Sequence, residues 1–177
     1  PLEIRALGTH MAYPAAVAVA IGERLGLTAE EMLRGVAAYR PAGSRMRVIR
    51  CTEGRILLDD CYNANPQSME AALRILAKER NTAAVLGDMG ELGELSEEAH
   101  CRTGALARSL GIGTLVAVGE KARAMARGAA GMDVCWFPTV EQAMEPLREL
   151  FRPGTVLLVK ASHAMRFERI VEGLRDL

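Results

Sequence analysis

Short apolar runs alternate with longer stretches of helical spacing over most of the chain, which predicts strands and helices in strict alternation. The runs of strand length are residues 46–51, 55–59, 82–86, 114–118, 134–137 and 155–159. The stretches with helical spacing are residues 69–78, 96–110, 121–127, 139–151 and 165–177. This alternation is typical of an α/β protein with a doubly wound, mostly parallel sheet.

The first two predicted strands are separated only by Thr52, Glu53 and Gly54. A connection this short joins antiparallel neighbours, because a parallel connection needs about a dozen residues or more. We therefore expect a sheet of six strands, five of them parallel and one antiparallel.

The N-terminal part of the chain has a different pattern. Residues 1–7 predict a strand, and the nearly continuous Ala, Val and Ile of residues 11–25 predict a helix that is buried on most sides. Pro14 is compatible with that helix only in its first turn. A second helix should follow, because Thr28 and Glu31 have the spacing of a capping box.

The best candidate for a linker is residues 41–44, with the sequence Pro-Ala-Gly-Ser. A chain of 177 residues is long enough for one domain and a piece of another. We therefore expect a domain boundary there, with residues 1–41 in one domain and residues 42–177 in the next.

Two adjacent carboxylates, Asp59 and Asp60, lie where the second predicted strand passes into a loop. The carboxyl ends of the strands form the ligand crevice in an open α/β sheet, so we expect Asp60 to face solvent. A carboxylate there can accept hydrogen bonds from the hydroxyls of a ribose, or it can hold a hydrated Mg²⁺. The alternative is a solvated turn before a helix that starts with Pro66 and is capped by Ser68.

Two further strand-end loops could carry chemistry. Residues 87–94 are rich in glycine and carboxylates, which would repel phosphate and could instead meet an ammonium group, a metal or water. The last predicted strand ends with Lys160, Ser162 and His163 beside a helix start, a set that suits a carboxylate or phosphate ligand. A polar strand end with a serine cap is the alternative.

Composition excludes several classes of function. The 22 basic residues balance the 22 acidic ones, so nothing indicates a nucleic-acid footprint or an anionic-membrane surface. The four cysteines are far apart and form no C-x-x-C pair, which favours reduced thiols in a cytoplasmic protein over a zinc site or a disulfide framework. The histidines are too scattered to indicate a metal site.

Phosphate-binding loops of the G-x-x-x-x-G-K-[ST] and G-x-G-x-x-G types do not occur in the sequence. A phospho-acceptor receiver domain would need an Asp at the end of the third parallel strand, where the chain has Glu120. A small-molecule-binding domain without catalysis remains an alternative, because the sequence shows no pair of nucleophile and base.

Two motifs together resemble the C-terminal half of the Mur ligases. They are D-D-C-Y-N-A-N-P-Q-S at residues 59–68 and L-G-D-M-G-E-L-G at residues 86–93, with His100 downstream. Within the family, the pair is similar to the branch that joins D-alanyl-D-alanine to UDP-N-acetylmuramoyl-tripeptide; another Mur ligase subfamily is the alternative. The likeness extends from Gly8 to the last predicted helix.

The resemblance implies a three-domain enzyme. Residues 1–41 would be the end of the central ATPase domain, and residues 42–177 the Rossmann-like C-terminal domain. The family uses ATP and Mg²⁺ to convert the tripeptide carboxylate to an acyl phosphate, and the amine of D-alanyl-D-alanine then attacks it to give a peptidoglycan precursor. The phosphate loop, the metal ligands and the uridine site would lie upstream of Pro1, so we expect a cytoplasmic, monomeric protein that is inactive without its N-terminal domains.

The resemblance also implies roles for nucleotide-binding residues. Arg45 matches the arginine that reaches the nucleotide phosphates, and Asp60 matches the aspartate that binds the ribose. His10 matches the histidine near the adenine. Asn63 and Asn65, in the same loop as Asp60, are weaker nucleotide-binding candidates.

On the substrate side, the resemblance assigns the dipeptide to Lys160, Ser162 and His163. The family usually has arginine where this chain has His163, and an imidazole binds a carboxylate more weakly than a bidentate guanidinium does near pH 7. It usually has an asparagine that contacts nucleotide where this chain has Pro14, so adenine recognition would differ.

Overall fold

The computed structural model describes residues 3–41 and 43–177 and divides into two compact units, Pro1–Ala42 and Gly43–Leu177. The boundary between the units falls within the predicted linker, of which residue 42 lies outside the described residues. In both units together, no described helix combines the length and apolar character that a bilayer crossing requires.

The first unit consists of a short 3-10 helix, η1 (Thr9–Met11), and two helices, α1 (Ala12–Arg24) and α2 (Ala29–Ala38). The Thr28–Glu31 capping box at the start of α2 is confirmed, with both of its reciprocal hydrogen bonds present. An apolar groove of about 420 Å³ runs between α1 and α2.

Two predictions for this unit are wrong. Glu3 to Leu7 form no strand, and residues 1 and 2 lie outside the described residues. Helix α1 is not buried on most sides, since only Ala15 and Gly22 are buried among its residues. Two helices can cover only one face of each other, so the remaining apolar side chains of α1 stay exposed in this chain.

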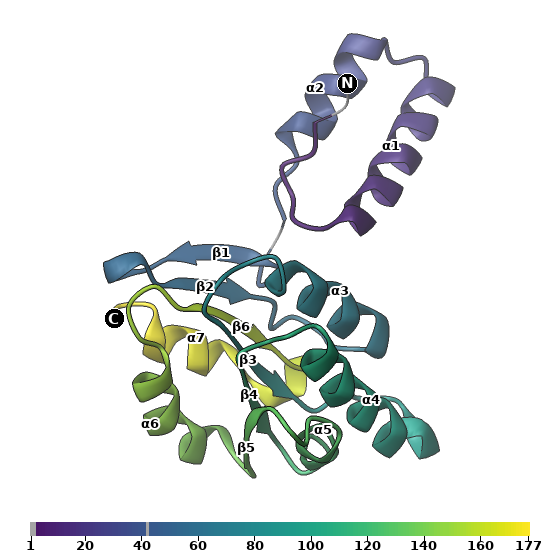
Figure 1. Cartoon of the computed structure of the whole chain (residues 1–177). Helices are drawn as coiled ribbons and strands as arrows, with labels where there is room; N and C mark the ends of the chain where they lie inside the picture. Colours follow the sequence, from purple (N-terminus) through teal and green to yellow (C-terminus); the bar gives the residue numbers. More distant parts are fainter. Residues whose placement is uncertain (1–2, 42) are drawn as a thin grey trace. The chain divides into compact units, whose positions relative to one another are not determined.

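The second unit is built on a six-stranded sheet with the order β1-β2-β6-β3-β4-β5 (Figure 1). The strands are β1 (Arg47–Arg50), β2 (Ile56–Asp59), β3 (Thr82–Gly87), β4 (Thr114–Val118), β5 (Asp133–Phe137) and β6 (Val156–Lys160). Strand β1 pairs antiparallel with β2, and all the other pairs are parallel, which confirms the predicted sheet. Between β1 and β2, Glu53 and Gly54 adopt positive φ values of 52° and 71° to make the tight turn.

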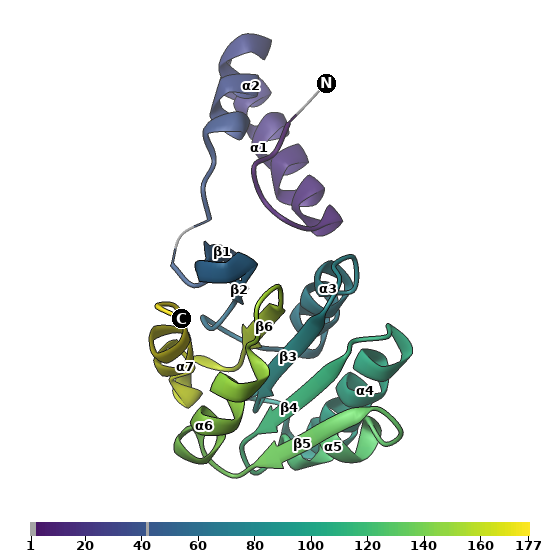
Figure 2. The same ribbon diagram turned by 60° about the vertical axis from the view of Figure 1, so that its left-hand side comes forward.

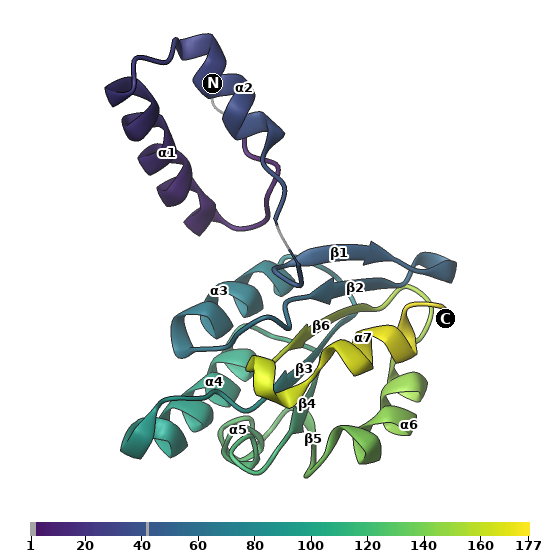
Figure 3. The ribbon, with the colours of Figure 1, turned by 180° about the vertical axis from the view of Figure 1, so that it is seen from behind.

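Helices cover both faces of this sheet, as the views in Figures 2 and 3 show. The helices are α3 (Pro66–Leu76), α4 (Ser96–Ser109), α5 (Arg123–Gly128), α6 (Val140–Leu150) and α7 (Glu168–Leu174). Alternate strand residues point to opposite faces, so Leu58, Ala84 and Leu115 pack under α3, α4 and α5, whereas Leu57, Val85 and Val116 pack under α6 and α7. The doubly wound architecture is therefore confirmed.

Two helix starts differ from the prediction. Asn65, not Ser68, caps α3: its side chain accepts a hydrogen bond from the Ser68 N–H, and the Ser68 hydroxyl in turn accepts one from the Asn65 N–H. Pro66 takes the first helical position, where its missing N–H costs nothing. Helix α7 starts later than predicted, because Arg166 adopts a left-handed conformation with φ 51° and separates it from the 3-10 turn η4 (His163–Met165).

We expect limited proteolysis of this chain to cut first within residues 41–44, because the two compact units are joined there by a short connection. The products should be a C-terminal fragment that resists further cleavage and a less resistant N-terminal one. Mass spectrometry of a time course identifies the first cut. A chain that stays intact until it is degraded throughout would contradict a domain boundary at this place.

Candidate functional site

The second unit has a topological switch point at β6. The chain leaves β2 and β3 toward α3 and α4 on one face of the sheet, whereas it leaves β6 toward α7 on the other face (Figures 1 and 3). Strand order places β6 between β2 and β3. Ligands bind outside the carboxyl ends of strands at such a point, so the loops after β2, β6 and β3 are the candidate site.

Asp60 and Lys160 form an ion pair at the centre of this site. The Lys160 ammonium lies 2.6 Å from the Asp60 Oδ2 atom and donates a second hydrogen bond, at 2.8 Å, to the Asn63 carbonyl. The other Asp60 oxygen accepts a hydrogen bond from the Met46 N–H at 2.9 Å. The side chain of Lys160 is 2% exposed and that of Asp60 is 15% exposed.

This geometry corrects two sequence-based expectations. Asp60 does not simply face solvent, because each of its carboxylate oxygens already has a partner within the chain. Lys160 lies in the interior with two acceptors and is not available at the surface of the crevice to bind a substrate directly. The pattern of a single strand could not reveal this, since Lys160 and Asp60 are brought together by the pairing of β6 with β2.

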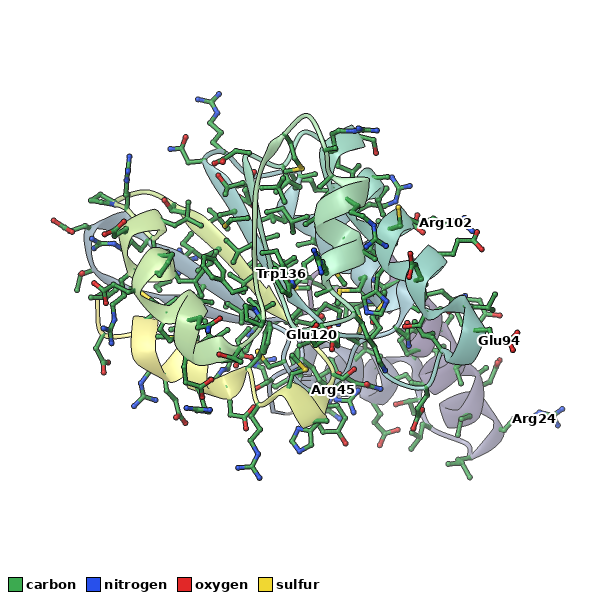
Figure 4. All side chains as sticks on the ribbon, turned by 90° about the horizontal axis from the view of Figure 1, so that it is seen from below. Arg24, Arg45, Glu94, Arg102, Glu120 and Trp136 are labelled. Carbon is green, nitrogen blue, oxygen red and sulfur yellow. The ribbon has the colours of Figure 1, made fainter. Side chains whose placement is uncertain are left out.

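Arg45, Tyr62 and His163 lie close together at the same strand ends. The Arg45 guanidinium carbon lies 3.9 Å from the centre of the Tyr62 ring, and the His163 ring centre lies 6.0 Å from that of Tyr62 at a tilt of 37°. All three side chains are exposed, Tyr62 by 49%. Figure 4 labels Arg45 together with Glu120, which follows β4, and Trp136, which lies in β5.

Tyr62 is a site residue that the sequence reasoning missed. It lies in the loop quoted for the family resemblance, but a tyrosine beside two aspartates carries no local signal that an arginine will cover its ring. The cation–π contact depends on Arg45, which precedes β1, and becomes visible only once β1 and β2 are paired.

The asparagines of the loop have local structural partners. The Asn63 side-chain oxygen accepts a hydrogen bond from the adjacent Ala64 N–H, and the Asn65 side-chain oxygen is occupied by the cap of α3. The NH₂ group of each side chain is the part of that side chain that can donate a hydrogen bond to a ligand. His10 is exposed and belongs to η1 of the first unit.

The loop after β3 is held from two sides by side chains. The Ser162 hydroxyl accepts a hydrogen bond from the Gly90 N–H at 2.8 Å, and the Asp88 carboxylate accepts one from the Ala122 N–H at 2.7 Å. The Ser162 N–H also donates to the Asp88 carbonyl at 3.1 Å. Asp88 is therefore engaged by the protein, and Ser162 links the loop after β6 to the loop after β3.

His100, in α4, supports the same loop through its ring nitrogens. Its buried ring accepts a hydrogen bond from the Met89 N–H at Nε2, at 2.9 Å, so the ring proton is on Nδ1, which donates to the Ser96 carbonyl at 2.6 Å. Both nitrogens are used, and the neutral ring is a structural support. This explains a residue for which the sequence suggested no role.

Cys61 is predicted to be unreactive in the folded chain. Burial, and next the adjacent Asp59 carboxylate, raise the pKa of its thiol well above the usual range, and its S–H donates to the Val159 carbonyl. Since the thiolate is the reactive form, iodoacetamide at pH 8 should label Cys51, Cys101 or Cys135, which are partly exposed, before Cys61. Peptide mass spectrometry with and without urea is the measurement; Cys61 labelled first in the folded chain would contradict this site geometry.

Residues 3–41 and 43–177 contain no group of three or more His, Cys, Asp or Glu side chains that could hold a metal ion. Mg²⁺ usually binds to one or two carboxylates together with substrate phosphates and water, so an Mg²⁺ site of that kind needs the nucleotide as well as the protein. We assign no step to a metal ion on this chain.

The chain is similar to known enzymes over most of its length. A family model described as "Mur ligase, glutamate ligase domain" matches residues 44–163. The UDP-N-acetylmuramoyl-tripeptide–D-alanyl-D-alanine ligase of Mycobacterium leprae is 37% identical over an alignment 188 residues long, and the alignment covers 93% of this chain and 36% of that protein. The enzyme of the same name from Treponema pallidum is 37% identical over 174 residues, with 95% and 38% covered.

Solved structures give the same result for the fold. MurF from Acinetobacter baumannii superposes with a TM-score of 0.90 at 30% identity, over 98% of this chain and 39% of that one. MurF from Thermotoga maritima in complex with ADP has a TM-score of 0.81 at 23% identity, over 96% of this chain and 39% of that one. This chain thus spans less than two fifths of the length of these relatives.

Proposed function

The chain belongs to the Mur ligase family, and we propose that it is the C-terminal part of an ATP-dependent ligase that joins D-alanyl-D-alanine to UDP-N-acetylmuramoyl-tripeptide. The observation that carries the proposal is the 37% identity to relatives of that name over at least 93% of this chain. In this proposal residues 1–41 are the end of the central ATPase domain, and residues 42–177 are the C-terminal domain. The enzyme would be cytoplasmic and monomeric.

On the nucleotide side, Arg45 would bind the phosphates and Asp60 the ribose of ATP. The Arg45 guanidinium lies over the Tyr62 ring, and its fork of N–H groups suits phosphate oxygens. Asp60 has one protein partner on each oxygen, and each carboxylate oxygen can accept a further hydrogen bond. His10 would lie near the adenine, with Asn63 and Asn65 as weaker contacts through their amide groups.

On the peptide side, we assign Ser162 and His163 to the carboxylate of D-alanyl-D-alanine. His163 is exposed at the end of the β6 loop, and its imidazole is next to the Tyr62 ring. The Ser162 hydroxyl accepts from Gly90, so its own proton is free to point at a carboxylate. Lys160 would act on this side only indirectly, because it is buried against Asp60.

The proposed reaction divides between this chain and the upstream domains. The tripeptide carboxylate takes the γ-phosphoryl group of ATP, giving an acyl phosphate and ADP. The dipeptide amine then attacks the acyl carbon and loses a proton, and phosphate leaves as the amide bond forms. The rate of the first step depends on a phosphate loop that positions the γ-phosphate and on Mg²⁺ that neutralises its charge. This chain would bind the ribose, the phosphates and the dipeptide and so complete the site.

We expect this chain alone to release no phosphate from ATP in the presence of Mg²⁺, UDP-N-acetylmuramoyl-tripeptide and D-alanyl-D-alanine. Adding the first two domains of a relative in trans should restore dipeptide-dependent release, and Arg45→Ala in this chain should lower it. Turnover by the isolated chain would contradict the proposed division of the site. ADP binding without any turnover in the complemented mixture would favour a small-molecule-binding domain without catalysis.

A further inference from the structure

Two hydrogen bonds hold the backbone on either side of Arg45. The Tyr62 N–H donates to the Ser44 carbonyl at 3.1 Å, and the Met46 N–H donates to the Asp60 carboxylate at 2.9 Å. The loop after β2 is thus hydrogen-bonded to the segment before β1 at Ser44 and at Met46, the two residues on either side of Arg45. Both bonds restrain the backbone from which the Arg45 side chain extends.

Met46 carries backbone strain at this point. Its φ of 52° lies in the left-handed region, which an unbranched, non-glycine residue adopts only when its surroundings enforce it. Of the two bonds that flank Arg45, the one from the Met46 N–H ends on a charged acceptor, and a charge-assisted hydrogen bond is the stronger kind. The Asp60 carboxylate is therefore the group that holds the strained residue.

Lys160 in turn holds Asp60. Its ammonium reaches the second Asp60 oxygen and the Asn63 carbonyl, so it holds both ends of the four-residue segment that contains Tyr62. The Tyr62 ring is the surface on which the Arg45 guanidinium lies. A side chain buried in the last strand is thus connected to Arg45 by two routes: through the Asp60–Met46 backbone bond, and through the Tyr62 ring.

We propose that Lys160 and Asp60 form a clamp that positions Arg45 for an anionic ligand with several phosphate groups. Lys160 is a positioning residue in this scheme and contacts no ligand. The identity of the ligand as the phosphate chain of a nucleotide rests on the proposed function, whereas the clamp rests on the contacts within the chain. The alternative is that Lys160 only stabilises the fold, in which case its loss would leave the Arg45 side chain where it is.

The first experiment reads the position of Arg45 without any ligand. The ring of Tyr62 should shift the Arg45 side-chain proton resonances upfield, and Tyr62→Leu defines the value without the ring. We expect Lys160→Met, and the charge-balanced double variant Asp60→Asn/Lys160→Met, to lose most of that upfield shift in the full 177-residue chain. Lys121→Met, at an exposed lysine after β4, is the matched control and should keep it. An unchanged Arg45 shift in a folded double variant would overturn the clamp.

The second experiment reads the consequence for binding, with tripolyphosphate as a probe that has no ribose and so does not report on Asp60 as a ribose ligand. We expect Arg45→Ala and Lys160→Met each to weaken tripolyphosphate binding about tenfold, as for the loss of one charge-assisted contact. The combined variant Arg45→Ala/Lys160→Met should bind tripolyphosphate no more weakly than Arg45→Ala alone. If the losses of affinity multiply in Arg45→Ala/Lys160→Met, the clamp is overturned, since Lys160 then acts independently of Arg45. If the upfield shift is lost but neither single variant weakens tripolyphosphate binding, the clamp stands and the proposed phosphate-binding role of Arg45 fails.

Discussion

Asp60→Ala is expected to lower the free energy of unfolding of this chain by about 3 kcal/mol, the lower end of the range for breaking a buried ion pair by removing one partner. The cost arises because Lys160, which is 2% exposed, would be left as an uncompensated buried ammonium. The Met46 N–H would also lose its acceptor. Urea unfolding followed by circular dichroism measures the change.

Two controls separate the ion pair from a general effect of losing a carboxylate. Glu120→Ala removes an exposed carboxylate at the end of strand β4 and should stay within about 0.5 kcal/mol of the parent chain. Asp60→Ala/Lys160→Met should recover much of the lost stability, because the buried charge is then gone as well. An Asp60→Ala chain as stable as Glu120→Ala would show that the ion pair contributes nothing to folding.

The same substitution in a full-length enzyme should raise the Michaelis constant for ATP. Each lost hydrogen bond between the carboxylate and a ribose hydroxyl is worth about 1–3 kcal/mol, since it involves a charged acceptor. The assay needs conditions in which the variant is shown to be folded, because part of any loss of activity would otherwise reflect unfolding. An unchanged dependence on ATP concentration in a folded variant would remove Asp60 from the proposed ribose site.

Gly104→Val is expected to destabilise the second unit by about 3 kcal/mol or more, at or beyond the upper end of the usual cost of overpacking. A Cβ atom at Gly104 would lie 1.9 Å from the Met125 carbonyl oxygen, and one at Gly128 would lie 1.9 Å from the Cys101 carbonyl oxygen. Helices α4 and α5 thus cross with their backbones in direct contact. A backbone atom cannot move aside without displacing the whole of α5.

Gly104→Ala tests the same contact with the smallest possible side chain and should still be clearly destabilising. Gly35→Ala is its matched control, because a Cβ atom at Gly35 in α2 would meet nothing within 4 Å. Gly35→Ala should leave the stability of α2 unchanged or raise it by about 0.5–1 kcal/mol, because alanine is more favourable than glycine in the middle of a helix. Thermal unfolding and hydrogen exchange of α5 measure the effect; a Gly104→Ala chain with unchanged exchange in α5 would contradict the close crossing.

Local patterns predicted most of the architecture. Each of the six strands predicted after residue 45 overlaps an observed one, and the short Thr52–Gly54 connection correctly indicated the antiparallel β1–β2 pair. The prediction that failed most clearly, a largely buried α1, failed because burial depends on which other elements are present to cover a helix. The same reasoning placed the start of α3 at Pro66 correctly but named Ser68 as its cap where the structure has Asn65, since either residue type can cap.

The sequence by itself determined the order of strands and helices, the doubly wound class and the loops that carry the polar residues, because periodicity and turn residues act over a few positions. It also identified the family through two motifs. Only the tertiary structure decided what those polar residues touch. Lys160 neutralises Asp60 across 100 positions of sequence, and Tyr62 carries Arg45 only because β1 folds back on β2. A contact of this kind is set by strand pairing and by the distance between two atoms, neither of which leaves a mark in the spacing of residues along the chain.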